Sequence, residues 1–72
     1  MDVAKLSDGG LRSLHGAILI AIATDDNTPS NKAKPHGVRE LPDWKQFADE
    51  LEAELTRRQL KYHPVPWRKP TD

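Results

Sequence analysis

The sequence predicts a small all-α fold: an antiparallel two-helix hairpin with a long loop and an extended C-terminal segment packed across it. Apolar residues recur at helical spacing in two stretches, about 7–23 and 42–60. Between them, residues 24–37 are rich in Asp, Asn, Pro and Gly and have no apolar period. A loop of that length in so short a chain is expected either to be mobile or to lie over the surface.

The first helix is expected to start at Ser7, whose hydroxyl can accept a hydrogen bond from the free amides of the first turn. Asp8 then lies favourably at the positive end of the helix dipole. One apolar face follows, made of Leu11, Leu14, Ile18 and Ile22. A strand is the alternative for 17–23, because isoleucines alternate there with smaller residues. The continuation of the apolar face toward the N-terminus favours the helix.

The second half of this helix is apolar all round. Ile20 points nearly opposite to Ile18, so one neighbouring helix cannot cover both. A stripe of small residues at four-residue spacing permits another backbone to come close: Ser13, Ala17 and Ala21. We therefore expect either Trp67 of the C-terminal segment or a second copy of the chain to cover Leu19 and Ile20.

The second helix is the clearest element. Residues 38–41 before it are expected to be extended, because a residue preceding proline avoids helical angles. Pro42 suits the first helical position. An apolar arc follows, made of Trp44, Phe47, Ala48, Leu51 and Leu55. Polar residues are assigned to the opposite side: Lys45, Asp49, Glu52 and Thr56. Glu54 and Arg58 form a favourable i,i+4 pair, and the helix is expected to end near Gln59 or Leu60.

The two apolar faces and the C-terminal segment predict the core. Prolines at 64 and 66 favour an extended segment, from which Tyr62, Val65 and Trp67 are expected to fold back onto the helices. Six side chains are expected to be among the most buried: Leu14, Ile18, Trp44, Phe47, Leu51 and Leu55.

Composition restricts the class of protein. The 72 residues form a single domain, 1–72, whose ends (1–6 and 68–72) are expected to be frayed. Without cysteine, disulfides and thiolate metal sites are excluded. Eleven basic residues balance eleven acidic ones, so no overall field attracts nucleic acid or an acidic membrane. The apolar run ending in Ala21-Ile22-Ala23 lacks a basic flank for a signal peptide and is too short to span a membrane, so we expect a cytoplasmic protein.

The chemical motifs all fail on spacing. Asp25-Asp26-Asn27 suggests a calcium loop, but Ser30 and His36 stand where glycine and glutamate are required, so the cluster is interpreted as turn residues bonding their own backbone. The three histidines at 15, 36 and 63 have no metal-ligand spacing and are interpreted as solvated or at the edge of the core.

No cofactor or catalytic site is expected. The acids of the second helix lie on its wet side, with nothing to desolvate them: Asp49, Glu50, Glu52 and Glu54. No glycine-rich phosphate loop or activated serine is present. The chain is therefore predicted to be non-catalytic.

The strongest charge feature is a basic C-terminal stretch with two aromatic residues. It is a candidate nucleic-acid patch, made of Arg57, Arg58, Lys61, Tyr62, Arg68 and Lys69. The simpler interpretation is that bases at the end of a helix match its dipole. Zero net charge favours the simpler interpretation.

The predicted function is that of a small protein-interaction or structural module that associates with itself, forming a homodimer. A chain this short has few other means of stabilisation. The candidate protein interface comprises Ser13, Ala17, Leu19, Ile20, Ala21 and Trp67. A nucleic-acid accessory protein is the alternative, and an enzyme comes third.

Overall fold

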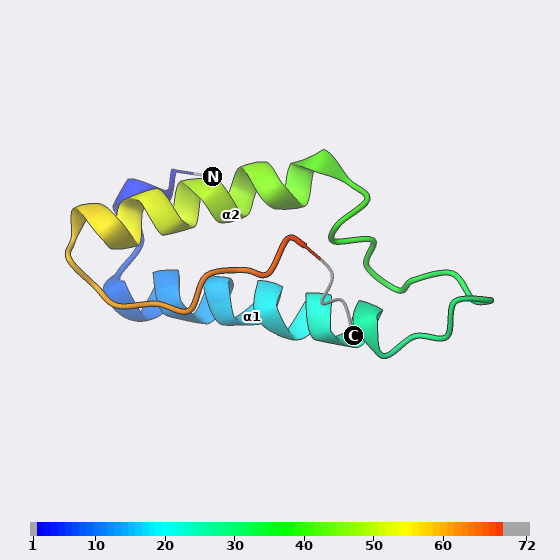
Figure 1. Cartoon of the computed structure of the whole chain (residues 1–72). Coiled ribbons are helices and arrows are strands. Elements are labelled where there is room, and N and C mark those ends of the chain that lie inside the picture. Colours follow the sequence, from blue (N-terminus) through cyan, green and yellow to red (C-terminus); the bar gives the residue numbers. More distant parts are fainter. Residues whose placement is uncertain (1, 69–72) are drawn as a thin grey trace.

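The structure, a computed structural model, describes residues 2–68 of the chain. It contains a short 3₁₀ turn, η1 (Val3–Lys5), and two helices, α1 (Asp8–Asp26) and α2 (Pro42–Arg57). The helices run antiparallel, and the loop that joins them extends beyond one end of the pair (Figure 1). The all-α hairpin predicted from the sequence is confirmed.

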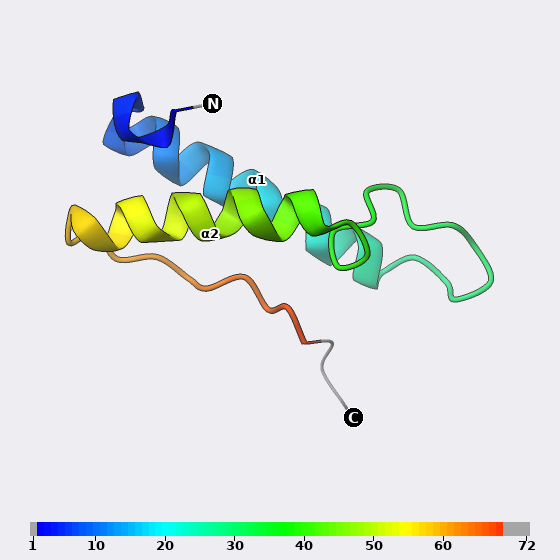
Figure 2. The same ribbon diagram turned by 90° about the horizontal axis from the view of Figure 1, so that it is seen from above.

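Residues 61–68, called the C-terminal segment below, are extended and run back along the helical pair. Figures 1 and 2 show this segment leaving the end of α2 and returning beside both helices on one side of the hairpin. Val65 places its side chain in the core. The hairpin therefore has a third, non-helical component along the line where α1 and α2 meet.

α1 begins where the sequence predicts and runs three residues further than expected. The Ser7 hydroxyl caps it by accepting a hydrogen bond from the Gly10 N–H over 3.0 Å. The helix continues to Asp26, so 17–23 is helical throughout and the loop begins at Asn27. The predicted start of the loop, residue 24, is three residues too early, because polar side chains at a helix end can find partners elsewhere in the fold.

α2 begins at Pro42, as predicted, and the preceding Leu41 is extended, with φ −101° and ψ 120°. The extended conformation predicted for residues 38–41 holds only at this last position. The N–H groups of Glu40 and Leu41 both donate to the Gly37 carbonyl, so the chain turns sharply before the helix. Gly37 has φ +65°, which favours glycine.

α2 ends at Arg57, earlier than the Gln59 or Leu60 predicted from helical spacing. The Leu60 N–H donates to the Leu55 carbonyl and the Gln59 N–H to the Thr56 carbonyl, both over 2.9 Å, which is the Schellman arrangement. Gln59 takes the left-handed position with φ +60°. Glycine normally occupies this position, and another residue costs about 1–2 kcal/mol there.

The N-terminus is attached to the end of α2. In place of the fraying predicted for 1–6, the described part of this stretch forms η1, which is capped by the Asp2 carboxylate accepting from the Ala4 N–H over 3.1 Å. The Arg58 guanidinium donates to the Ala4 carbonyl over 3.0 Å. Fraying is also predicted for residues 68–72, but residues 69–72 lie outside the described part of the chain.

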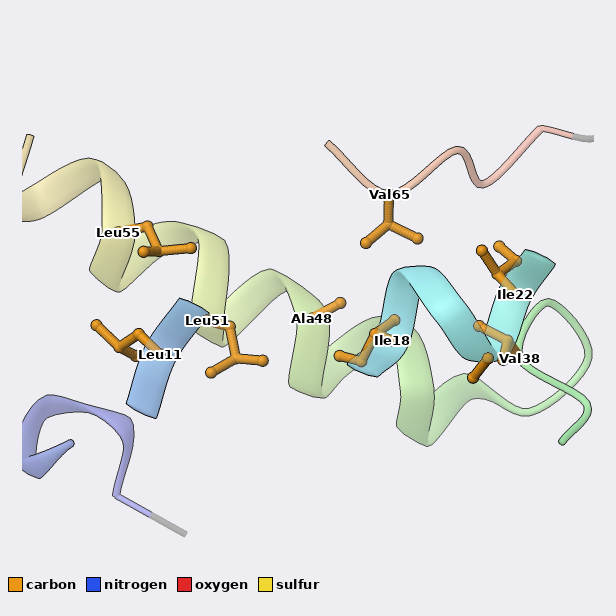
Figure 3. Close-up of a cluster of buried hydrophobic side chains, with 9 residues drawn as sticks. Leu11, Ile18, Ile22, Val38, Ala48, Leu51, Leu55 and Val65 are labelled. Carbon is orange, nitrogen blue, oxygen red and sulfur yellow. The ribbon is translucent and has the colours of Figure 1, made fainter. Parts of the chain in front are cut away.

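The core is one row of buried apolar side chains along the contact between the helices (Figure 3). Its members are Leu11, Ile18, Ala21, Ile22, Val38, Ala48, Leu51, Leu55 and Val65. Two of them come from outside the helices, because Val38 belongs to the loop and Val65 to the C-terminal segment. The expectation that Val65 folds back onto the helices is confirmed.

The prediction of the most buried side chains is right for half of the set. Three are buried: Ile18, Leu51 and Leu55. The other three are half-buried at the rim of the core: Leu14, Trp44 and Phe47. Ala48 occupies the middle of the contact, opposite Ile18, and has no exposed surface (Figure 3). A small residue there lets the helices approach closely, and the bulkier Trp44 and Phe47 pack beside the contact instead of inside it.

We expect Leu51→Ala to lower the free energy of unfolding by about 2–5 kcal/mol, because Leu51 is completely buried and truncation leaves a cavity. Leu41→Ala is the matched control, since Leu41 is 53% exposed and its truncation should change stability by no more than about 0.5 kcal/mol. Urea unfolding followed by circular dichroism measures both. Equal effects of the two substitutions would contradict the assigned core.

Candidate functional site

A polar cluster joins α1, α2 and the C-terminal segment. His15 of α1 is 3% exposed, and its Nε2 donates to a carboxylate oxygen of Glu52 on α2 over 2.8 Å. The same oxygen accepts the Val65 N–H over 3.1 Å. The Tyr62 ring meets the His15 imidazole edge-on, with 5.5 Å between centroids. His15 is therefore buried, and the assignment of Glu52 to the wet side of α2 is wrong.

Helical spacing carries a signal for this contact that the sequence interpretation missed. At 100° per residue, His15 lies about 60° from Ile18 around α1, and Glu52 lies about 80° from Trp44 around α2. Each residue therefore flanks its apolar face instead of opposing it. In residues 2–68, no group of three or more metal-ligating side chains includes the pair. The cluster serves as a link between three segments.

Asp25 makes a second link, between the end of α1 and the loop. Its carboxylate accepts the His36 N–H over 3.0 Å and the Val38 N–H over 2.8 Å. The interpretation of Asp25 as a turn residue bonding its own backbone is wrong, because both donors lie more than ten residues along the chain. Burial alone raises the pKa of Asp25, but the two amides, together with His36 and Lys34, lower it below its usual 3.8.

Asp25 belongs to the core face of α1. It lies about 20° from Ile18 around the helix, and it is 2% exposed. Its two oxygens are occupied by loop amides, which places Val38 in the core. The cluster at 25–27 is therefore a structural anchor for the loop.

Arg39 makes the third link, between the loop and the C-terminal segment. Its guanidinium pairs with Asp26 and donates to the carbonyls of Pro66 over 2.9 Å and Trp67 over 3.2 Å. The Lys45 ammonium lies 5.7 Å from the centre of the Trp67 ring, within range of a cation–π contact. The C-terminal segment is thus held by a carboxylate, a guanidinium and one buried apolar side chain.

Three of the candidate nucleic-acid residues make contacts within the chain: Arg57, Arg58 and Tyr62. Arg58 is committed within the chain, donating to Glu54 over 2.6 Å and to Asp8 over 2.9 Å. Arg57 also pairs with Glu54. Tyr62 is half-buried against His15. The remaining two described members, Lys61 and Arg68, are exposed, and Lys69 lies outside the described residues.

Glu54 is the centre of this arginine pair. The predicted i,i+4 contact with Arg58 is present, but Glu54 is only 7% exposed, so its assignment to the wet side of α2 is wrong. Hydrogen bonds from Arg57 and then Arg58 lower the pKa of Glu54 from 4.5 to about 2. The arginines thus hold a buried carboxylate in its charged form.

The candidate protein-interface residues divide between core and surface. Ala21 is buried in the core, and Leu19 and Trp67 are half-buried. Ser13, Ala17 and Ile20 are exposed on the side of α1 away from α2. Ile20 is 70% exposed, so the C-terminal segment does not cover it.

These exposed residues belong to a longer uncharged strip, called the outer face of α1 below. It comprises Gly9, Ser13, Gly16, Ala17, Ile20, Ala23 and Thr24, which all lie within about 60° of Ile20 around the helix. Six of the seven are exposed, and the seventh, Gly16, is half-buried. No atom lies within 4 Å of where a side chain would start at Gly9 or Gly16, so the backbone is open there. Ile20 is the one large side chain on this strip.

The surface depressions of the described residues are shallow. One of about 550 Å³ lies on α2 and is lined by Pro42, Lys45, Gln46, Asp49, Glu50 and Ala53. It is wide open to water, which leaves its carboxylates without the desolvation that acid–base chemistry requires. Neither His15 nor Glu52 lines it.

Comparison with known proteins adds no assignment. No family model, curated protein or solved structure matches the chain. Within residues 2–68, neither helix combines the length and the apolar character needed to cross a membrane. Any functional proposal therefore depends on the geometry alone.

The Glu54 cluster predicts a specific pH dependence. Because folding lowers the pKa of Glu54, the charged carboxylate stabilises the fold above pH 4.5, and this contribution is lost as the pH falls toward 2. We expect Glu54→Gln to be less stable than the wild type at pH 7, with the difference shrinking by pH 3. Urea unfolding at both pH values measures this. The exposed Glu50→Gln serves as control, and a Glu54→Gln deficit of equal size at both pH values would contradict the assignment.

Proposed function

We propose that the chain is a non-catalytic protein-interaction module that associates with a second copy of itself through the outer face of α1. The observation that carries this proposal is the 70% exposure of Ile20 in a strip of small, uncharged residues. A soluble helix that is apolar on its outer side is normally covered by another surface.

The shape of the strip favours a two-fold pair of antiparallel α1 helices. Two antiparallel copies can be placed so that Ile20 of each contacts Gly16 of the other. The numbers of any two residues that face each other then sum to 36. Gly16 offers open space at its α-carbon, so the helices can approach closely with Ile20 filling the hollow. Two-fold pairing of one surface with itself is the commonest form of self-association.

Electrostatics favour the same orientation. Antiparallel helices place the positive end of each dipole beside the negative end of the other. The exposed Arg12 of one copy then lies near the C-terminal end of α1 in the other, toward Asp26. The strip itself has no charge that pairing would bury, so association avoids the cost of removing an ion from water.

The expected affinity is modest. α1 has 19 residues and is therefore about 28 Å long. A standard interface buries about 800 Å² on each partner, which is about 15% of the 5237 Å² that this chain exposes. One helical face with its flanking side chains, Leu19 among them, supplies less than that. We expect a dissociation constant on the order of micromolar or weaker.

The alternative function, nucleic-acid binding by the basic stretch, has less support. Arg58 and Arg57 are paired with acidic side chains of the chain itself. Phosphate contacts would have to replace these ion pairs. Salt-dependent binding to a generic oligonucleotide would favour this alternative, because phosphate contacts release counterions.

We expect the wild type to show concentration-dependent dimerisation by analytical ultracentrifugation, and Ile20→Glu to remain monomeric. A glutamate at this position would place two like charges in the contact between the two α1 helices. Ile20 is exposed in the single chain, so its replacement leaves the fold intact. Ala53→Glu is the matched control, since it adds the same charge at an exposed position of α2. A wild type that stays monomeric at all concentrations, or an Ala53→Glu variant that loses dimerisation equally, would contradict the proposal.

A further inference from the structure

The C-terminal segment is bound to the helices as a separate peptide would be. Val65 anchors it in the core, with 5% of its surface exposed. Figure 3 shows the Val65 side chain directed toward the row of core residues between α1 and α2. The segment's amide at Val65 is held by Glu52, and its carbonyls at Pro66 and Trp67 are held by Arg39. An apolar anchor with main-chain bonds on either side is typical of an extended peptide in a groove.

The connection between α2 and this segment is strained. Gln59 has φ +60° without being glycine. The neighbouring residues 57–62 are compatible with a helix, and the first obstacle to helix continuation is Pro64, which disfavours helical angles at His63. Docking of the segment in its own groove therefore forces a reversal at Gln59 that the local sequence does not favour.

We propose that the C-terminal segment exchanges between two copies of the chain, with Gln59 as the hinge. In the exchanged dimer, the chain continues past Gln59 in the direction of α2 without reversing, and the segment enters the groove of the other copy. Val65, Glu52 and Arg39 then make between copies the contacts that they make within one chain. The exchanged and closed forms differ mainly at the hinge, which is the condition under which such exchange costs little.

The occupant of the groove is the second copy's segment because every copy carries both halves of the contact. The covalent connection to α2 opposes exchange, because it presents a chain's own segment to its groove at an effective concentration on the order of millimolar. Relief of the left-handed conformation at Gln59 favours exchange by about 5- to 30-fold for each chain. Exchange is therefore expected at high protein concentration, and the resulting dimers should separate slowly on dilution.

This inference does not depend on the outer face of α1, which lies on the other side of that helix. The two are separated by working in the Ile20→Glu background, where pairing through the outer face is blocked. A dimer that forms in this background cannot come from the contact between α1 helices proposed above.

Substitutions at Gln59 test the hinge directly. The side chain is exposed, so replacing it leaves the core and the groove unchanged. Gln59→Gly removes the strain from the closed form. Because two hinges open for each dimer, it should lower the association constant of the dimer by at least about 25-fold. Gln59→Thr should raise the association constant of the dimer several-fold. A β-branched residue is strongly disfavoured at positive φ, so it adds strain to the closed form. Size-exclusion chromatography after concentration to about 1 mM, the range of the segment's effective concentration, measures both.

The exchanged contact itself is read by isotope-filtered NMR on a mixture of labelled and unlabelled Ile20→Glu/Gln59→Thr chains. We expect proximity signals between Val65 methyl groups of one copy and the Ile18 or Ile22 methyl groups of the other. A Gln59→Thr chain that stays monomeric, a Gln59→Gly chain that dimerises equally well, or a dimer whose Val65 signals are all within one chain would overturn the proposal.

Discussion

The fold depends on covering a two-helix contact with backbone that has no regular secondary structure. α1 and α2 meet along one narrow row, and Val38 and Val65 complete it from the loop and the C-terminal segment. Backbone amides at such positions must find partners, because a buried N–H without one is costly. Two carboxylates on the helices, Asp25 and Glu52, supply them. A carboxylate on each helix therefore helps to position one of the two non-helical segments.

This arrangement explains how the charges are distributed. Acidic and basic residues are equal in number, and several of them form ion pairs that hold segments of the chain together. These pairs are Arg39 with Asp26, and Arg58 with Glu54 and Asp8. None of these groups lies on the outer face of α1, which stays uncharged. The polar residues stabilise the inside of the hairpin and its ends, while the strip around Ile20 remains available to a partner. Such a division favours a module that acts by association.

Local signals predicted the helices, and long-range contacts decided the rest. The Ser7 cap, Pro42 at the start of α2 and the helical apolar faces depend on neighbouring residues, so the sequence was sufficient for them. The roles of Asp25 and Glu52 depend on partners from distant segments, so turn chemistry and helical spacing assigned these residues to a turn and to the wet side of α2. The end of α2 was misplaced because Gln59 adopts a conformation that its type disfavours. Helical spacing alone placed Ile20 opposite the core, but it did not show whether the C-terminal segment reaches Ile20, and the segment leaves it 70% exposed.

Two helix carboxylates, the buried Asp25 and the half-buried Glu52, fix the loop and the C-terminal segment to the helices. Amide hydrogen exchange at Val38 and Val65, followed by NMR, tests this role, because a hydrogen-bonded N–H exchanges only when its contact opens. We expect both amides to be protected, Val38 to a level close to that of Leu51 in the middle of α2, since its bond to Asp25 is buried. Exchange of Val38 and Val65 at the rate of an unstructured peptide, with Leu51 still protected, would show that the helical pair is stable without these segments and that the two carboxylates do not fix them.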